Sequence, residues 1–449
     1  MKKRSVLMVI LALGLICLCG CGDRSPLDPD DPVTLHMWHN YGGDMQRTMD
    51  ELIDEFNGTV GKQEGILINV VAISSGTELS KSLDMIVSGD PGAPDMPDIF
   101  TGYPKTAVKF AGKGMLADLD GYFTQAELDG YVDSFIEEGR LQDGGLYVFP
   151  IAKSTEVLYL NRTLFDAFAE ATGAEESKLY TFEGLAELAQ SYYKWTDEQT
   201  PDVADDGRQF YSADSWFNFA EVGTSQLGGS IFSGESLELD TDELAWVFET
   251  AYYPAVKGGF AIHNGYSSDL SKTGDIICST GSSAGILFYG STVTYPDGRV
   301  EEVEYDILPY PVFENGQKTA LQRGGGLMVA KSTEKKEYAA AVFLKWLTDA
   351  EHNMKFVGQT GYLPVTKEAF EQLMPDYVQA MEDGSIKKML TTVMDMYASY
   401  TFFTAPDYPD FDSDSSGFET EFKELLKNHR TEYLSTAALR LTEALAEIR

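Results

Sequence analysis

The chain has 449 residues, with 34 Lys and Arg against 71 Asp and Glu, so its formal net charge is −37 at neutral pH. This charge argues against nucleic acid and anionic membrane surfaces as partners and favours solubility outside the cell. Only five His are present and no Cys-His cluster occurs, so we expect neither a metal nor a cofactor.

The N-terminus has the layout of a secretory signal. Basic residues at positions 2–4 precede an uncharged run that is too short to span a bilayer stably. The sequence LCGC at 18–21 resembles a bacterial lipobox, in which the final cysteine is diacylated and the leader before it is removed. We therefore expect a signal peptide over 1–20, lipidation of Cys21 and a polar tether over 21–32. The alternative is a metal-binding cysteine tract, but it lacks flanking His.

The residues after the tether predict alternating strands and helices. Apolar and polar residues alternate over 33–38, as in a strand, and the apolar spacing over 45–56 is helical. Residues 66–73 (ILINVVAI) are almost continuously apolar, which is typical of a strand covered on both faces. An amphipathic helix over 79–86 and a short strand from Asp98 follow. The alternation predicts an α/β unit with a parallel sheet.

Helical patterns become more frequent in the second half of the chain. Thr181 is a predicted N-cap, because it directly precedes a helical spacing of apolar residues. Residues 305–312 (YDILPYPV) predict a strand, residues 327–330 predict another that leads into a helix, and the last helices are expected from Phe418 onward. Cys278 has no cysteine partner and is expected to be a buried thiol.

Several stretches together resemble the carbohydrate-type (maltose-binding-protein-like) family of extracellular solute-binding lipoproteins of ABC importers. They are VTLHMW, PDIFTGY, YVFPIAKSTEVLYLNRTLFD, TFEGLAELA, GGGLMVAKSTEKKEYAAAVFLKWLT and GYLPV, in this order along nearly the whole mature chain. The resemblance implies a two-lobed periplasmic-binding-protein-like α/β fold of type II, whose discontinuous lobes are joined by hinge segments. It places 33–150 and 305–362 in the N-terminal lobe, and 151–304 and 363–449 in the C-terminal lobe.

The resemblance also implies a function without chemistry. The protein would capture a sugar, an oligosaccharide in our interpretation, and deliver it to the membrane permease subunits of an ABC importer. It would act as a monomer at the extracellular face of the bacterial membrane, held there by the lipid on Cys21. One alternative keeps the fold for another ligand, such as an acidic sugar near Lys153 and Arg323, or for a sensor co-receptor. A glycoside hydrolase or lyase using two carboxylates is a further alternative.

Candidate ligand contacts come from the residue types that sugars require. Hydroxyl groups suit planar polar side chains, and the C–H faces of sugar rings suit aromatic ones. Loops after parallel strands meet at one edge of the sheet, where ligands bind. The predicted contacts are Trp38, His39, Asn40, Tyr41, Ser74, Ser75, Tyr103, Thr155, Glu156, Trp216, Asn218, Tyr289, Arg323, Gly324 and Tyr362. For Thr155 and Glu156, ligand contact is what the family resemblance implies.

One acidic run has two interpretations. Residues 410–421 (DFDSDSSGFETE) alternate acidic side chains in a way that imitates an EF-hand loop, but Ser415 stands where the sharp turn needs Gly. We therefore prefer a solvated loop before a helix to a calcium site.

Overall fold

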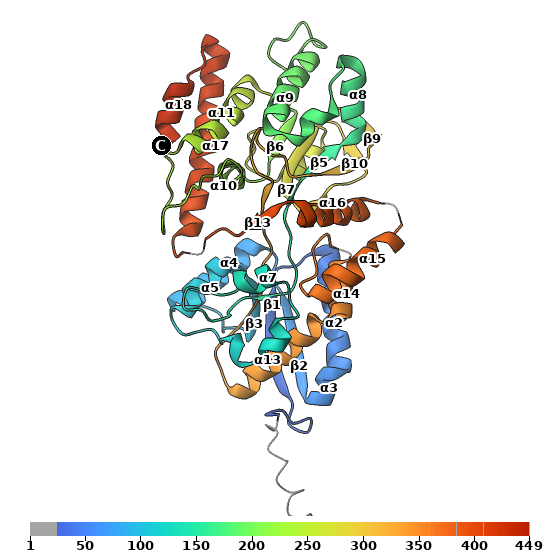
Figure 1. Ribbon diagram of the computed structural model, residues 1–449, viewed down its shortest axis with the longest axis vertical. Helices are drawn as coiled ribbons and strands as arrows, with labels where there is room; N and C mark the ends of the chain where they lie inside the picture. Colours follow the sequence, from blue (N-terminus) through green and yellow to red (C-terminus); the bar gives the residue numbers. More distant parts are fainter. Residues whose placement is uncertain (1–24, 359, 383, 407, 449) are drawn as a thin grey trace, which may run out of the picture.

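The computed structural model describes residues 25–358, 360–382, 384–406 and 408–448. These residues form two lobes, each built on its own β-sheet, which stand one above the other in Figure 1. The predicted signal peptide and Cys21 lie outside the described residues. Residues 25–32 of the expected tether are described and contact the first lobe, where Asp31 forms an ion pair of 2.7 Å with Lys335.

The sheet of the first lobe has five strands in the order β2-β1-β3-β12-β4. Strand β1 pairs in parallel with both β2 and β3, whereas β12 is antiparallel to β3 and β4. Leu35, Met37 and His39 of β1 are buried and alternate with more exposed residues, which confirms the predicted strand. The strands are β1 (Val33–His39), β2 (Ile66–Ala72), β3 (Ile99–Gly102), β4 (Phe149–Pro150) and β12 (Gly326–Val329).

Helices cover this sheet and extend beyond it on the right of Figure 1. The predicted helix after β1 is confirmed, with Met49, Leu52, Ile53 and Phe56 buried on one face. The helices are α2 (Gly43–Gly58), α3 (Val60–Glu64), α4 (Gly76–Ser88), α5 (Pro104–Ala111), α6 (Gln125–Leu128), α7 (Asp133–Glu138), α13 (Glu334–Leu347), α14 (Ala350–Val357) and α15 (Met374–Ala380), with the short turns η1 (Leu119–Gly121) and η4 (Ala369–Leu373).

The expectation that residues 66–73 are covered on both faces is wrong. Strand β2 is the edge of the sheet, and Leu67 and Val71 are 47 % and 43 % exposed. Helices α2 and α3 cover only the opposite face, where Ile66 and Ile68 are buried. A run of apolar residues therefore does not show whether both faces of its strand are covered.

The second lobe has a four-stranded sheet in the order β10-β5-β7-β6. Thr181 caps the predicted helix α9 by accepting a hydrogen bond from the Gly184 amide at 3.1 Å. Cys278, at the start of β7, is a buried free thiol as expected. The strands are β5 (Glu156–Asn161), β6 (Tyr211–Ala213), β7 (Cys278–Ser282) and β10 (Tyr305–Pro309), with the hairpin β8 (Thr292–Thr294) and β9 (Val300–Glu302) beside them.

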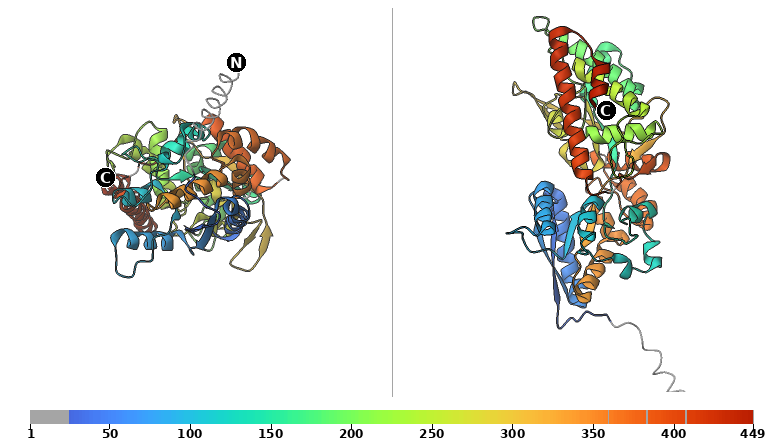
Figure 2. Two further views of the ribbon diagram at one scale, coloured as in Figure 1. Left: turned by 90° about the horizontal axis from the view of Figure 1, so that it is seen from below. Right: turned by 90° about the vertical axis from the view of Figure 1, so that its left-hand side faces the viewer.

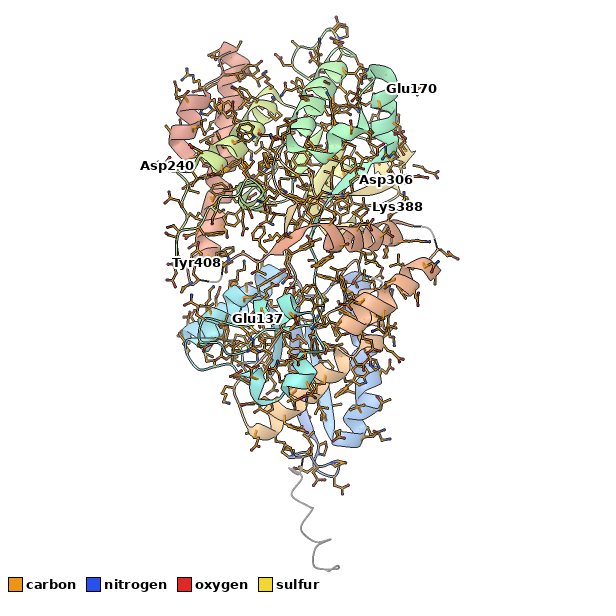
Figure 3. All side chains as sticks on the ribbon, viewed as in Figure 1. Glu137, Glu170, Asp240, Asp306, Lys388 and Tyr408 are labelled. Atoms are coloured by element: carbon orange, nitrogen blue, oxygen red, sulfur yellow. The ribbon has the colours of Figure 1, made fainter. Side chains whose placement is uncertain are left out.

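The helices of the second lobe pack on both sides of its sheet (Figure 1). They are α8 (Arg162–Thr172), α9 (Phe182–Asp197), α10 (Trp216–Gln226), α11 (Asp242–Lys257), α12 (Ser267–Lys272), α16 (Ser385–Ser399), α17 (Phe411–Thr436) and α18 (Leu441–Ile448), with η2 (Glu176–Tyr180) and η3 (Ser283–Phe288). Lys388 of α16 is paired with Asp306 of β10 at 2.7 Å, and both are labelled in Figure 3. Figure 2 shows the long helix α17 on one side of this lobe, with its first turn directed toward the first lobe.

The lobe boundaries differ from those expected. Residues 305–309 were assigned to the first lobe, but β10 pairs antiparallel with β5 of the second. The chain returns to the first lobe only after β11 (Thr319–Leu321), which pairs with β13 (Thr401–Phe403) between the lobes. Val365 was assigned to the second lobe, but its amide donates to Asn353 of α14 at 2.8 Å. A strand pattern in the sequence does not identify the sheet that the strand joins.

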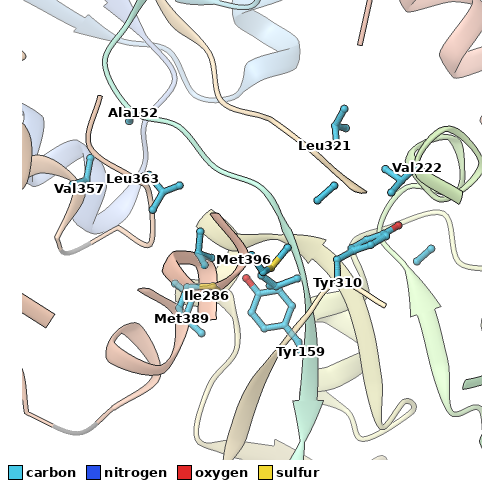
Figure 4. Close-up of a cluster of buried hydrophobic side chains, with 14 of the residues drawn as sticks. Ala152, Tyr159, Val222, Ile286, Tyr310, Leu321, Val357, Leu363, Met389 and Met396 are labelled. Atoms are coloured by element: carbon cyan, nitrogen blue, oxygen red, sulfur yellow. The ribbon is translucent and has the colours of Figure 1, made fainter. Parts of the chain in front are cut away.

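Apolar contacts continue through the region where the chain crosses between the lobes. Figure 4 shows Ala152 and Leu363 on one side of the crossing, with Tyr159, Ile286 and Met389 on the other. All five belong to the same buried cluster. Among the described residues, no helix combines the length and the apolar composition that a membrane span needs.

Candidate functional site

A cavity of about 820 Å³ lies between the two lobes. Its volume falls within the range of about 300–1,000 Å³ that is typical of ligand sites. The first lobe contributes the start of α5 and the end of α7, where Glu137 is labelled in Figure 3. The second lobe contributes α10, the loop before α12 and the first turns of α17, and residues 321–324 close the cavity at the crossing.

Two predicted residues that line the cavity, Asn218 and Arg323, both contact the buried predicted residue Glu156. Arg323 Nη1 is 2.7 Å from Glu156 Oε1, and the Asn218 amide donates to the same oxygen at 2.6 Å. Burial raises the pKa of Glu156, and the charge of Arg323 and the Asn218 hydrogen bond partly offset this. Burial opposes the charge of Arg323, but Glu156 together with Asp214 and two nearby tyrosines holds the pKa of the guanidinium above its usual value. The ion pair therefore joins the crossing segment that carries Arg323 to β5, and the Asn218 hydrogen bond adds α10 to the same network.

The cations that line the cavity each have a carboxylate partner. Lys105 of the first lobe is paired with Asp412 of the second, so this contact spans the two lobes. The other pairs are Arg140 with Asp120 at 2.5 Å, Arg323 with Glu156 at 2.7 Å, and Lys423 with Glu419 at 2.6 Å.

Two further carboxyl groups line the cavity and were not predicted. Asp214 accepts a hydrogen bond from the Ser267 amide at 2.9 Å, and burial raises its pKa. Glu221 of α10 is 3 % exposed, and burial together with the nearby charge of Glu156 raises its pKa to about 8. Within the described part of the chain, neither oxygen of Glu221 has a hydrogen-bond partner. The detectable signal was a single charged residue in a helix whose other residues are all uncharged, WFNFAEVGTSQ.

Of the predicted first-lobe residues, Tyr103 lines the cavity and is 48 % exposed. The others surround the ends of the strands. His39 is fully buried, and its Nδ1 accepts a hydrogen bond from the Tyr41 amide at 3.2 Å. Asn40 accepts one from the Thr101 hydroxyl at 3.2 Å, and Trp38 packs against the smaller apolar cluster of the lobe. Ser75, next to the exposed Ser74, is the N-cap of α4 and accepts a hydrogen bond from the Glu78 amide at 3.2 Å.

Among the predicted second-lobe residues, too, some line the cavity and others do not. Asn218 lines the cavity, whereas Trp216 is fully buried and stacks on Phe422 with ring centroids 5.4 Å apart. Tyr289 stacks on Tyr159 at 3.9 Å and is half-buried. Tryptophan and tyrosine patterns in the sequence do not separate a core ring from a cavity ring.

The remaining predicted residues lie at the crossing. Thr155 is buried and donates to the Leu321 carbonyl at 2.9 Å. Gly324 lines the cavity with a φ of 105°, and a Cβ there would lie 2.7 Å from the Ala152 carbonyl oxygen, so the close approach of the two segments requires glycine. Tyr362 is half-buried; burial and the nearby Tyr103 raise its pKa, whereas Arg323 opposes the rise.

The acidic run 410–421 is helical from Phe411 onward, as part of α17. The expected solvated loop before the helix is therefore wrong, and the calcium alternative loses the loop geometry on which it depended. Asp412, Ser415, Ser416 and Glu419 line the cavity instead. In the ranges that the structure describes, no three His, Cys, Asp or Glu side chains are placed to hold a metal ion.

Residues 281–285 (GSSAG) match the G-x-S-x-G pattern of serine hydrolases at a turn from β7 into η3. Ser283 is fully buried, and its hydroxyl accepts a hydrogen bond from the Thr155 amide at 3.4 Å. No hydrogen bond from Ser283 to a histidine occurs in the described structure. The match lacks the general base that would activate a nucleophile.

Comparison with known proteins agrees with this architecture. The family described as bacterial extracellular solute-binding protein matches residues 51–382. The sn-glycerol-3-phosphate-binding periplasmic protein UgpB of Escherichia coli K12 is 23 % identical over 362 residues, which is 76 % of each chain.

Two solved structures show the same two-lobed fold and confirm the predicted fold class. The cyclic alpha-maltosyl-1,6-maltose binding protein from Arthrobacter globiformis has a TM-score of 0.70 at 19 % identity, covering 93 % of this chain and 97 % of its own. UgpB from Mycobacterium tuberculosis, in complex with glycerophosphocholine, has a TM-score of 0.68 at 20 % identity, covering 93 % and 96 %. The chain belongs to the family of bacterial extracellular solute-binding proteins.

Proposed function

We propose that the protein is the substrate-binding lipoprotein of an ABC importer and that it captures a sugar, an oligosaccharide by class, between its lobes. The observation that carries the proposal is the polar cavity of about 820 Å³, in which carboxylates, an amide and a guanidinium lie beside exposed Tyr103 and Tyr266. Acceptors and donors of this kind suit sugar hydroxyls, and the two exposed rings suit the faces of sugar rings.

The relatives support this class of ligand without identifying it. The Arthrobacter protein is named for a cyclic maltosyl-maltose, and the two UgpB proteins are described with glycerol phosphate compounds. Each cation that lines the cavity is already paired with a carboxylate, so a phosphate would have to displace one of them. Lys153, which the acidic-sugar alternative used, is 2 % exposed and paired with Glu138 at 3.0 Å. These contacts favour an uncharged glycan over an anionic one.

Delivery to permease subunits and membrane attachment complete the proposal. Cys21 would carry the lipid, and the residues after it would hold a monomeric receptor near its membrane partner at the extracellular face. The lobes would close on the ligand, because a ligand that contacts both lobes favours the closed arrangement. The proposal assigns binding and no catalysis to the cavity.

The test is a binding screen of the purified protein against neutral oligosaccharides, followed by tryptophan fluorescence and isothermal titration calorimetry. We expect at least one glycan to bind with a Kd of about 1 µM or below. Small-angle scattering should then show a smaller radius of gyration with that glycan. Failure of every glycan to bind would contradict the sugar assignment, and release of reducing ends from a bound glycan would contradict a purely binding role.

A further inference from the structure

Glu221 is an ionisable group of the cavity wall that is both buried and unpaired in the described structure. It belongs to α10, lines the cavity and is 3 % exposed, and neither of its carboxyl oxygens has a hydrogen-bond partner among the described residues. An unpaired carboxylate away from water is costly, so a group of this kind requires a physical explanation. Because no hydrogen bond from the described residues fixes the carboxyl group, it can turn toward a ligand without breaking one.

The charges of the cavity do not balance within the protein. Lys105, Arg140, Arg323 and Lys423 each form an ion pair with a carboxylate. Glu138 is paired with Lys153, and Glu137 with Arg140 at 3.4 Å. In the described structure Asp214 and Glu221 therefore remain as the lining carboxyl groups without an ion pair. The nearby cations Arg323 and Lys423 are each paired with another carboxylate, so a full counter-charge for Glu221 would come from a proton or from the ligand.

We propose that Glu221 determines the specificity of the cavity by binding a protonated amino group, so that the preferred ligand is an amine-bearing sugar. The proposal rests on the function proposed above. A hydroxyl group would supply one hydrogen bond and no charge, whereas an ammonium supplies both to a buried carboxylate. Asp214 lines the same wall and adds to the attraction. Phosphate and carboxylate ligands would meet two acidic groups and are disfavoured.

Binding of the amine would release a proton. Without a ligand, burial raises the pKa of Glu221 to about 8, so the group is largely protonated at pH 7. A ligand ammonium stabilises the carboxylate form, and the proton leaves Glu221 for the solvent. The titratable and charged groups around Glu221 are Glu156 on β5, Arg323 at the crossing, Tyr310 after β10, Tyr408 before α17, and Asp214, Glu419 and Lys423 on the cavity wall.

The experiment compares matched ligands of equal length in which N-acetylation removes the charge of the amino groups. Glucosamine, galactosamine and mannosamine oligomers and their N-acetylated counterparts of equal length are titrated into the full protein by calorimetry at pH 5.5, where both Glu221 and the ligand amines carry their protons before binding. Two buffers with different ionisation enthalpies report the number of protons released. We expect one amine-bearing series to bind at least tenfold more tightly than its N-acetylated counterpart, with release approaching one proton per ligand.

Glu221→Gln keeps the size of the side chain and removes its charge. It should abolish both the tenfold preference and the proton release while the N-acetylated ligand still binds. Glu249→Gln, an exposed change on α11 that removes the same charge, should leave both quantities unaltered. Proton release is measured on the unmodified protein, so the test does not depend on the folding of a variant.

The outcomes separate this inference from the function on which it rests. Neutral glycans that bind as tightly as amine-bearing ones, or amine binding without proton release, would overturn the role of Glu221 and leave the sugar assignment standing. A preference that survives in Glu221→Gln would also overturn it. Failure of every neutral and amine-bearing glycan to bind would overturn the proposed function itself.

Discussion

Ser154 and Arg323 exchange two backbone hydrogen bonds, with the Ser154 amide 2.8 Å from the Arg323 carbonyl and the Arg323 amide 2.7 Å from the Ser154 carbonyl. The outgoing and returning crossing segments are therefore paired at the point where they pass between the lobes. Glu156 follows two residues after Ser154, and its carboxylate is paired with the Arg323 side chain. Arg323 therefore belongs both to the paired crossing segments of the hinge and to the lining of the cavity.

Removing the guanidinium should destabilise the protein. Arg323→Met leaves Glu156, whose side chain is 4 % exposed, without its counter-charge. Breaking a buried ion pair costs about 3–5 kcal/mol, and because the Arg323 side chain is about a third exposed we expect a loss of roughly 2 kcal/mol. Urea unfolding measures the change in the free energy of unfolding.

The matched control is Arg47→Met, because Arg47 and its partner Asp44 are both largely exposed. This change should alter the free energy of unfolding by about 0.5 kcal/mol or less. The double variant Arg323→Met with Glu156→Met should recover part of the lost stability, since no charge is then left buried. Equal unfolding midpoints for Arg323→Met and the unmodified protein would contradict the argument.

The stability of the protein should depend on pH through Glu221. Its pKa is raised from 4.5 to about 8 in the folded chain, so between these values the folded chain keeps a proton that the unfolded chain has lost. Stability therefore falls as the pH rises through this window. Glu221→Gln removes the effect, and at pH 8–9 it should be more stable than the unmodified protein by an amount on the order of 3 kcal/mol, an advantage that disappears toward pH 4.5.

Melting temperatures measured from pH 5 to 9 check this expectation. The curve for Glu249→Gln should run parallel to that of the unmodified protein, because Glu249 is exposed. A difference between Glu221→Gln and the unmodified protein that does not change with pH would show that Glu221 keeps an ordinary pKa.

The exposed ring of Tyr266 should contribute to ligand affinity without contributing to stability. Tyr266 lines the cavity from the loop before α12 and is 72 % exposed. Loss of an aromatic contact worth about 1.4 kcal/mol corresponds to a tenfold change in Kd. Tyr266→Ala should therefore raise the Kd for a bound glycan about tenfold and leave the melting temperature unchanged. Tyr180→Ala, which removes an exposed ring outside the cavity, is the control and should change neither quantity.

Cys21 and Cys278 offer a comparison for the proposed lipid anchor. In bacterial cells, Cys21→Ala should abolish labelling by radioactive palmitate and release the protein from the membrane fraction. Cys278→Ala removes a thiol that is buried at the start of β7, so labelling should be retained. Palmitate labelling of the Cys21→Ala variant would contradict the lipobox interpretation.

The sequence was sufficient for features that depend on local patterns. The alternation over 33–38, the cap at Thr181 and the helix after residue 330 each depend on neighbouring residues, and all three are confirmed. Partners distant in the sequence were harder to predict. Whether β10 joins the first or the second sheet depends on pairing with β5, more than 140 residues earlier.

Prediction of the cavity residues from the sequence was limited in the same way. Arg323 and Asn218 were predicted from residue type, and the structure brings both to Glu156. Trp216 has the residue type of a sugar contact, but its place in α10 turns the ring into the core. Glu221 lies five residues further along the same helix and lines the cavity. Only the orientation of α10 against α11 and α17 separates these two positions, and the sequence does not specify that orientation.

The exposed edge strand β2 carries a safeguard against self-association. The Asn57 side chain accepts a hydrogen bond from the Ile68 amide at 2.8 Å and donates one to the Ile68 carbonyl at 2.9 Å. These are the backbone groups that a strand from another molecule would need in order to extend the sheet. Asn57 therefore hinders two copies of the chain from pairing edge to edge at this position of β2.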